Sequence, residues 1–233
     1  MSPDEIQLEN RLNLERGASV TSSEVVIMGI DAPTPISISG GRYSIDGGDF
    51  VDNEGLIENN QSLVVSATAP NEFSTEATIV LTIGDQQFDF TLGTRAADTE
   101  PDPIVFTPRS DVERASVILS NSVRLSGVEA PLSISVSEGT EYRLDEAEFT
   151  SAPGMVNPEQ GITLRLTSSA EFSSPTTGIL TLNGRDISFQ VLTLASDTQP
   201  DAFDRAEQQG LPLLTRAVSE PIVIAGINDA ASI

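Results

Sequence analysis

The chain has 233 residues, of which 35 are acidic and 12 are basic, so its formal net charge is −23. It contains no histidine, cysteine, lysine or tryptophan. These absences exclude thiolate and imidazole metal sites, Ser-His-Asp and Cys-His nucleophiles, lysine Schiff bases and disulfides. A pair of carboxylates is the remaining acid–base device, and we therefore predict that the protein is not an enzyme.

The acidic charge also restricts the partners of the chain. Nucleic acids and anionic membrane surfaces require a basic footprint, so we expect neither as a partner. No apolar run reaches the roughly 18 residues of a membrane span, and we expect no membrane insertion. The acidic N-terminus has no continuous apolar core, which predicts either a cytosolic protein or a mature or excised piece. The acidic excess favours a salty, charge-screened environment.

An internal repeat with a period of 98 to 99 residues organises the chain. Fixed-period similarity of this kind is a stronger fold signal than local propensity. Three positions anchor the alignment of the repeats: Pro3-Asp4 with Pro101-Asp102 and Pro200-Asp201, and Gly29 with Gly127 and Gly226. We predict repeats over residues 1–99 and 100–198, followed by an incomplete third repeat over residues 199–233 that holds only the first strands.

Within each repeat the apolar residues alternate with polar ones, which is typical of half-buried strands. Leu63, Val65 and Ala67 alternate with more polar neighbours, as do Ile162 and Leu164 in the next repeat. Gly, Pro, Asn and Asp interrupt these runs every 8 to 12 residues or so, which is typical of antiparallel sandwiches and barrels. We predict an all-β fold of tandem immunoglobulin-like antiparallel β-sandwiches with seven or eight strands each.

Turn and loop signals complete this interpretation. Gly84-Asp85 and Asn183-Gly184 each predict a tight hairpin. The acidic loop Asp46-Gly47-Gly48-Asp49, with Asp52 and Glu54, lacks calcium-binding spacing and predicts a solvated hairpin. We expect loops in three irregular stretches, with room for a helical turn: residues 9–17, 107–115 and 206–214.

The repeat resembles a tandem module of large bacterial secreted and surface proteins, and the resemblance covers nearly the whole chain. The residues that carry it are Tyr43, Asp46, Gly47, Gly48, Phe50, Thr82, Gly84, Asp98, Thr99, Pro101, Asp102, Phe106, Ser120, Asn121, Gly127 and Pro131. The chain departs from the pattern at Leu144-Asp145-Glu146-Ala147, where the Gly-Gly turn is missing. The resemblance implies an immunoglobulin-like spacer of adhesin-like or filamentous extracellular proteins, without catalytic residues.

Two interpretations apply to the acidic residues at the repeat junctions. Asp98, Glu100 and Asp102 at one junction, with Asp197 and Asp201 at the next, are candidate oxygen ligands for Ca²⁺. Calcium takes six to eight such ligands, and a shared ion would stiffen an array of repeats. The alternative is that Pro and Asp form polar linker turns without a metal. We expect no other cofactor.

The incomplete third repeat carries Ile222, Ile224 and Ile227 at positions that match core positions of the complete repeats. Their strands lack partners within the repeat, and unpaired apolar edges invite pairing with another chain. One interpretation is that the chain is a segment cut from a longer array. The other is that residues 215–233 are complemented by a neighbouring copy, which would build a filament by strand addition.

Two functions are consistent with these features. The first is a structural stalk or filament at a bacterial cell surface, whose partners are neighbouring repeats or copies of the chain itself. The alternative is a carbohydrate- or surface-binding adhesion module, which predicts an exposed aromatic or polar patch in one repeat only. A glycosidase would need an aromatic-lined cleft, but the Phe and Tyr residues mostly occupy matched core positions.

Overall fold

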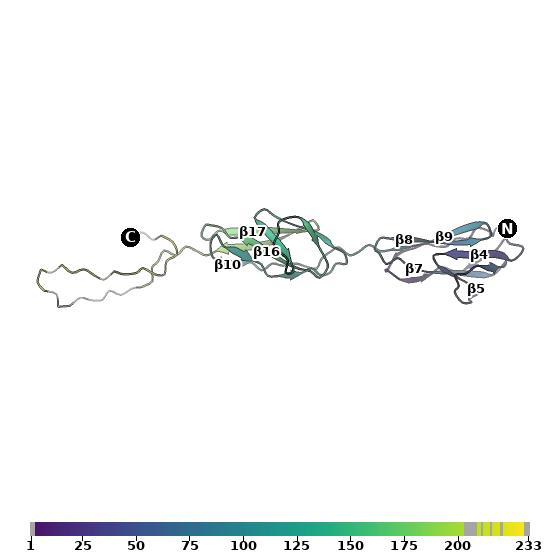
Figure 1. Ribbon diagram of the computed structural model, residues 1–233, viewed down its shortest axis with the longest axis horizontal. Coiled ribbons are helices and arrows are strands. Elements are labelled where there is room, and N and C mark those ends of the chain that lie inside the picture. The colour runs from purple at the N-terminus through teal and green to yellow at the C-terminus, as the bar shows by residue number, and fades with distance from the viewer. Residues whose placement is uncertain (1–2, 203–208, 211, 215, 220, 231–233) are drawn as a thin grey trace. The chain divides into compact units, whose positions relative to one another are not determined.

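The computed structural model describes residues 3–202, 209–210, 212–214, 216–219 and 221–230. All named elements in these ranges are β-strands, and the ribbon in Figure 1 shows arrows without coils. No described residue belongs to a helix long and apolar enough to span a membrane. The chain divides into two compact units, residues 1–98 and 99–233. Each unit contains one β-sandwich, which we call repeat 1 and repeat 2, so the predicted all-β fold of tandem β-sandwiches is confirmed. Each repeat has nine named strands rather than the seven or eight predicted, because several are only two to four residues long.

The two repeats contain corresponding sets of strands. Repeat 1 consists of β1 (Arg11–Leu14), β2 (Ser19–Thr21), β3 (Val25–Val26), β4 (Thr34–Ser39), β5 (Arg42–Ile45), β6 (Gly55–Ile57), β7 (Ser62–Thr68), β8 (Glu76–Ile83) and β9 (Gln86–Thr94). Repeat 2 consists of β10 (Arg109–Val112), β11 (Val117–Leu119), β12 (Val123–Arg124), β13 (Leu132–Val136), β14 (Thr140–Leu144), β15 (Gly154–Val156), β16 (Gly161–Thr167), β17 (Pro175–Leu182) and β18 (Arg185–Thr193).

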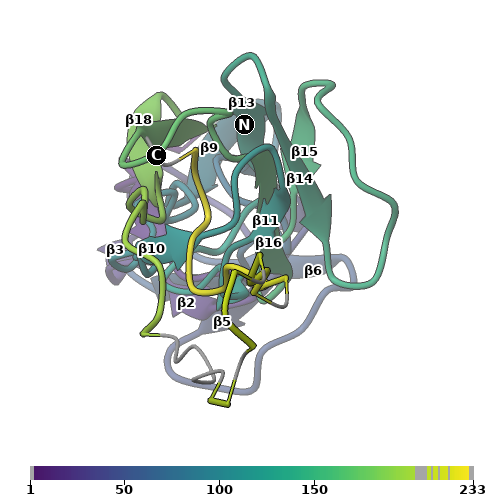
Figure 2. The ribbon, with the colours of Figure 1, turned by 90° about the vertical axis from the view of Figure 1, so that its left-hand side faces the viewer.

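Each repeat has two sheets with the strand grouping of an immunoglobulin domain. In repeat 1 one sheet has the order β1-β9-β8-β4-β6, and the other pairs β2, β3 and β5 with β7. Repeat 2 has the same arrangement, β10-β18-β17-β13-β15 facing β11, β12, β14 and β16, and Figure 2 labels most of these strands. Pairing is antiparallel except that β1 runs parallel to β9, and β10 parallel to β18.

The inward-facing residues of both sheets form a separate core in each repeat. Leu63 and Val65 in β7 are fully buried, and so are Ile162 and Leu164 at the matching positions of β16. The predicted alternation therefore places the correct faces inward. Burying side chains of this size contributes about 1.5–3 kcal/mol each, which makes these cores the main source of stability.

The loop prediction for residues 9–17 and 107–115 is wrong, because each stretch contains a short parallel strand, β1 or β10. Asn13 and Asp111 adopt positive φ angles of 59° and 55°, and the strand register shifts at these points. This irregularity interrupts the alternation by which a strand is recognised. The third predicted loop, residues 206–214, falls largely outside the described residues.

The departure at residues 144–147 keeps the hydrogen bond of the turn but changes its backbone conformation. Ala147 donates its main-chain N–H to the Leu144 carbonyl at 3.0 Å, as Gly48 does to Ile45 at 2.9 Å in repeat 1. Asp145 and Asp46 take positive φ angles of 51° and 47°. Aspartate tolerates this left-handed conformation. Gly47 also has a positive φ, of 70°, whereas Glu146 does not, so the turn of repeat 2 needs no glycine.

Separate cores predict that a cavity in one repeat will leave the other repeat unaffected. We expect Leu164→Ala to destabilise repeat 2 by about 2–5 kcal/mol, because the residue is fully buried. Calorimetry of the whole chain should then show one transition at lower temperature and one unchanged. Val65→Ala is the matched variant and should move the other transition. A common shift of both transitions in either variant would contradict separate cores.

Candidate junction sites and interaction surfaces

The strongest motif of the sequence forms the same contact in all three repeats. We call it the Asp–Gly clasp. The main-chain N–H of the aspartate in each Pro-Asp pair donates to the carbonyl that precedes the repeated glycine. The three bonds are Asp4 to Met28 at 2.8 Å, Asp102 to Ser126 at 3.0 Å, and Asp201 to Ala225 at 2.9 Å. The clasp joins the start of each repeat to the loop about 25 residues later.

The clasp requires glycine for two reasons. Gly29, Gly127 and Gly226 have φ angles of 81°, 78° and 80°, a conformation that side chains rarely adopt. A Cβ at Gly127 would also lie 2.9 Å from the main-chain nitrogen of Asp102. The Asp102 carboxylate accepts a further bond from the Ser126 hydroxyl at 2.8 Å. The clasp therefore explains why the glycine recurs at this position.

The predicted calcium ligands within residues 99–233 have protein partners. Glu100 lies 3.5 Å from Arg185, Asp102 takes part in the clasp, and Asp197 accepts the main-chain N–H of Gln199 at 2.9 Å. The Asp201 carboxylate lies beside Gly226. Among the described residues, no group of three or more acidic side chains is arranged to hold a metal ion. This holds for the predicted ligand Asp98 as well. Calcium binding stays a prediction, without a formed site to support it.

Asn228 makes a second contact at the junction between repeat 2 and the third repeat. Its side-chain oxygen accepts the N–H of Asp197 at 2.6 Å, and its side-chain nitrogen donates to the Ala195 carbonyl at 3.0 Å. Its own N–H donates to the Asp197 carbonyl at 2.9 Å. The residues that leave repeat 2 are thus held by the loop that follows the third clasp.

Each repeat also contains a buried tyrosine that fastens the loop before β6 or β15. The hydroxyls of Tyr43 and Tyr142 donate to the carbonyls of Asn53 and Ala152, both at 3.0 Å. Both rings are buried, and burial raises the pKa of both hydroxyls above the usual value of 10.0. These tyrosines form part of the scaffold and do not line a cleft.

The acidic loop of repeat 1 also has a structural role. The Asp46 carboxylate accepts the N–H of Ser62 at 2.8 Å and the side-chain amide of Gln61 at 2.8 Å. Asp145 makes the corresponding bonds to Gly161 at 2.8 Å and Gln160 at 3.3 Å. These bonds hold the turn after β5 or β14 against the start of β7 or β16.

The prediction that matched phenylalanines lie in the core is wrong for four of them. Phe50 is 40% exposed, and three others are half-buried beneath arginine side chains: Phe73, Phe149 and Phe172. The guanidinium carbon of Arg16 lies 4.0 Å from the ring centre of Phe73, and that of Arg114 lies 3.7 Å from Phe172. Arginine therefore covers aromatic faces that periodicity alone cannot separate from core residues.

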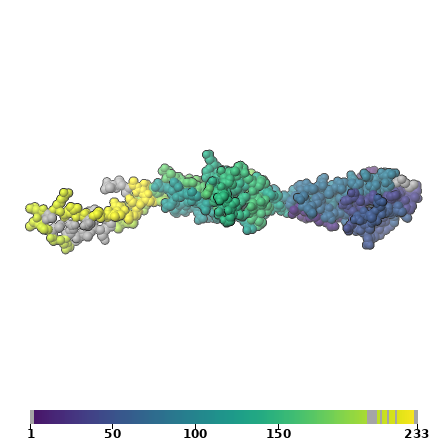
Figure 3. Space-filling view, in the orientation of Figure 1, coloured from purple at the N-terminus to yellow at the C-terminus, as the bar shows by residue number. Residues whose placement is uncertain are grey.

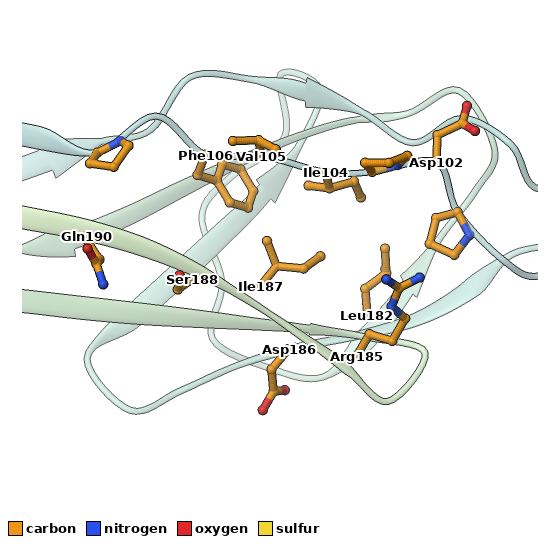
Figure 4. Close-up of a pocket in the computed structure, with 13 residues that line it drawn as sticks. Asp102, Ile104, Val105, Phe106, Leu182, Arg185, Asp186, Ile187, Ser188 and Gln190 are labelled. Atoms are coloured by element: carbon orange, nitrogen blue, oxygen red, sulfur yellow. The ribbon is translucent and has the colours of Figure 1, made fainter.

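A groove lies between the N-terminal segment and the last strand of each repeat. In repeat 2 it has a volume of about 500 Å³, between residues 101–108 and the first half of β18. Figure 4 shows Ile104 and Ile187 pointing into it from opposite sides. The corresponding groove of repeat 1 is lined mainly by polar residues, among them Glu5, Gln7 and Gln87. Sequence reasoning missed both grooves, because they depend on where strand pairing stops.

The described residues of the third repeat form no strand. Ile222 is half-buried, whereas Ile224 and Ile227 are 52% and 36% exposed. At the position of Ile224 the complete repeats have Ile27 and Leu125, which are fully buried. The yellow atoms of residues 221–230 are uncovered on the face shown in Figure 3. The predicted interface residues are thus apolar and largely exposed.

No protein family model and no curated protein matches the chain. Among solved structures, it is similar to the titin domains Z1Z2 in complex with telethonin, with 12% identity and a TM-score of 0.38 over 84% of this chain and 96% of that one. Domains 4 and 5 of the S-layer protein SbsC give 9% identity and a TM-score of 0.30 over 68% and 100%. The strand pairing of the two repeats itself defines the fold class.

Replacing the clasp glycine tests whether the contact matters beyond backbone strain. We expect Gly127→Ala to destabilise repeat 2 by about 1–3 kcal/mol. The added methyl group would clash with Asp102, and alanine at position 127 would have to adopt the left-handed conformation. Gly139→Ala is the matched control, since its φ is also 78° but nothing lies within 4 Å of the added carbon. Chemical unfolding measures both. Equal losses would show that the clasp contributes nothing.

The buried tyrosines predict a loss of stability at alkaline pH. Their folded pKa lies above the unfolded value of 10.0, so their contribution is fully present below pH 10 and disappears as pH rises through the folded pKa. Thermal melts from pH 9 to pH 11.5 should show this decline. The Tyr43→Phe, Tyr142→Phe double variant should be less stable at pH 8, by about 1 kcal/mol per hydroxyl bond, but flatter with pH. An equal decline in both proteins would argue against the assignment.

Proposed function

We propose that the chain is a non-enzymatic structural segment of a stalk or filament outside a bacterial cell. Its sandwiches serve as spacers, and copies associate through the third repeat. The observation that carries this proposal is the repetition of one self-contained unit. Each complete repeat closes its own core, and the same clasp begins all three repeats. Serial arrays of this kind gain length by adding units, and each unit contributes its own stability.

The use of polar side chains within the sandwiches supports a structural role. Ser22 and Ser120 accept main-chain N–H groups of the central strands β7 and β16 at 3.0 and 2.9 Å. Thr94 and Thr193 fasten the ends of β9 and β18 by donating to the carbonyls of Glu72 and Glu171. These bonds recur in both repeats at matching positions. A scaffold role accounts for such duplication, whereas a catalytic site needs one particular constellation.

The extracellular bacterial setting is supported by the resemblance of the repeat to modules of large secreted and surface proteins. The acidic net charge of the chain agrees with a saline exterior, because salt weakens the repulsion between carboxylates at high ionic strength.

A second candidate is an adhesion module, and one observation favours it. The groove of repeat 2 has more apolar lining residues than that of repeat 1, so the two repeats differ at this surface, as they would in a binding module. However, carbohydrate recognition relies on exposed aromatic faces, and the lining of the repeat 2 groove has one aromatic residue, Phe106, which is buried. The groove therefore fits an aliphatic peptide better than a sugar.

Mechanical stretching of single molecules tests the spacer role. We expect two separate unfolding events, each releasing about 330 Å of chain, from roughly 95 residues at about 3.5 Å each. Leu164→Ala should lower the force of one event only. Surface labelling of intact source cells tests the setting and should modify the protein. One merged event would contradict the spacer role, and protection from labelling until lysis would contradict the extracellular setting.

A further inference from the structure

The last strand of repeat 2 has an open edge. β18 pairs with β17 from Arg185 to Leu192, which is all but its last residue. On its other side, β10 pairs with it only through Val191 and Thr193. Residues 185–190 therefore have no strand partner on the side that faces the groove, and residues 101–108 form the opposite wall (Figure 4).

At the corresponding edge of repeat 1 a side chain caps one main-chain donor, and repeat 2 lacks this cap. The side-chain oxygen of Asn10 accepts the main-chain N–H of Thr91 at 3.0 Å. Pro108 occupies the position of Asn10 in repeat 2 and has no such group. Alternate residues of a strand direct their main-chain groups to the same edge, so Gln190, Ser188 and Asp186 present theirs to the groove. The edge offers main-chain bonds to an added strand.

The lining of the groove favours an apolar strand in repeat 2 alone. Glu5 and Gln7 of repeat 1 are replaced by Pro103 and Val105. Ile104 and Ile187 contribute apolar side chains to the lining. A volume of about 500 Å³ is within the range of binding pockets and accommodates several aliphatic side chains. The charges in this lining are Asp102, Asp186 and Arg185, the last of which pairs with Glu100.

The chain itself contains a segment that matches this groove. Residues Pro221–Ile227 carry no charge, and five of the seven are Ile, Val or Ala. They form no strand, and Val223 and Ile224 are 87% and 52% exposed. Copies with a net charge of −23 repel one another, so contact is least costly between an uncharged segment and a groove of low net charge. The lining of repeat 2 has two aspartates and one arginine, whereas the three charged residues in the lining of repeat 1 are all acidic.

We infer that residues 221–224 of one copy, which precede the clasp at Ala225 and Gly226, add as a strand to the open edge of β18 in a second copy. This inference rests on the proposed function and names the acceptor surface for self-association. The donor and acceptor surfaces differ, so the contact is heterologous and can propagate into a filament. Salt should strengthen it by screening the repulsion between acidic copies.

Cross-linking between copies tests the inference, because the chain has no cysteine of its own. Ser188→Cys in one copy and Val223→Cys in another are mixed at high salt with a short bismaleimide. We expect a covalent heterodimer. Asp89→Cys is the matched control, since it occupies the same position in the groove of repeat 1. Equal cross-linking to both grooves, or none to repeat 2, would overturn the inference.

Sedimentation of further variants identifies the occupant. Ile224→Asp and Val105→Asp should each weaken self-association at least about tenfold. Leu213→Asp, at a residue that is 97% exposed outside the segment, should leave it unchanged. Val105 is itself 67% exposed, so its substitution should leave the fold intact, which calorimetry checks. If Val105→Asp weakens association but Ile224→Asp does not, another segment occupies the groove and the inference fails.

Completion of the third repeat is an independent control. Residues 135–198 joined after Ile233 continue the repeat in register, because Ile233 aligns with Ile134. Ile224 should then be buried within a third sandwich, as Leu125 is in repeat 2, and self-association should be lost. Persistent association with a folded third repeat would contradict donation by this segment. In either result, the spacer role is judged separately, by whether the original chain shows two unfolding events under force.

Discussion

The requirement that each repeat bury its own apolar residues underlies the whole structure. Sheets with period-two alternation have one apolar face, and in a sandwich two such faces pack together and are buried from water. Phe90 and Phe189 lie at the centre of the two cores, fully buried at matching positions. Once a core is closed within about 95 residues, the next repeat can begin independently. The same sequence pattern can therefore specify one sandwich after another along the chain.

The clasp shows how a repeat begins. Its main-chain bond and positive-φ glycine tie the N-terminal segment to the loop that follows β3 or β12. In the third repeat the bond between Asp201 and Ala225 is present although the described residues contain no strand. The clasp is thus a local structure that does not depend on a complete sandwich. Asn228 adds the connection to the preceding repeat through Asp197 and Ala195.

Much of the fold could be predicted because alternation and turn residues are local signals. Leu63 and Val65, with their matched residues, were assigned to the correct face, and Asn183-Gly184 to its hairpin. The short strands β1 and β10 escaped prediction because Asn13 and Asp111 interrupt the alternation. Phe73 and Phe172 have the periodicity of core residues, but arginine covers them from outside. The open edge of β18 depends on where its parallel partner stops, which no local pattern encodes.

Native-state hydrogen exchange is the most direct test of independent repeats. At increasing denaturant, the slowest amides of β7 and β8 should converge on one unfolding free energy, and those of β16 and β17 on another. In dilute protein, the amides of residues 222–224 should exchange fast. A single free energy shared by all four strands would contradict the account, because it would mean that the two sandwiches unfold as one body.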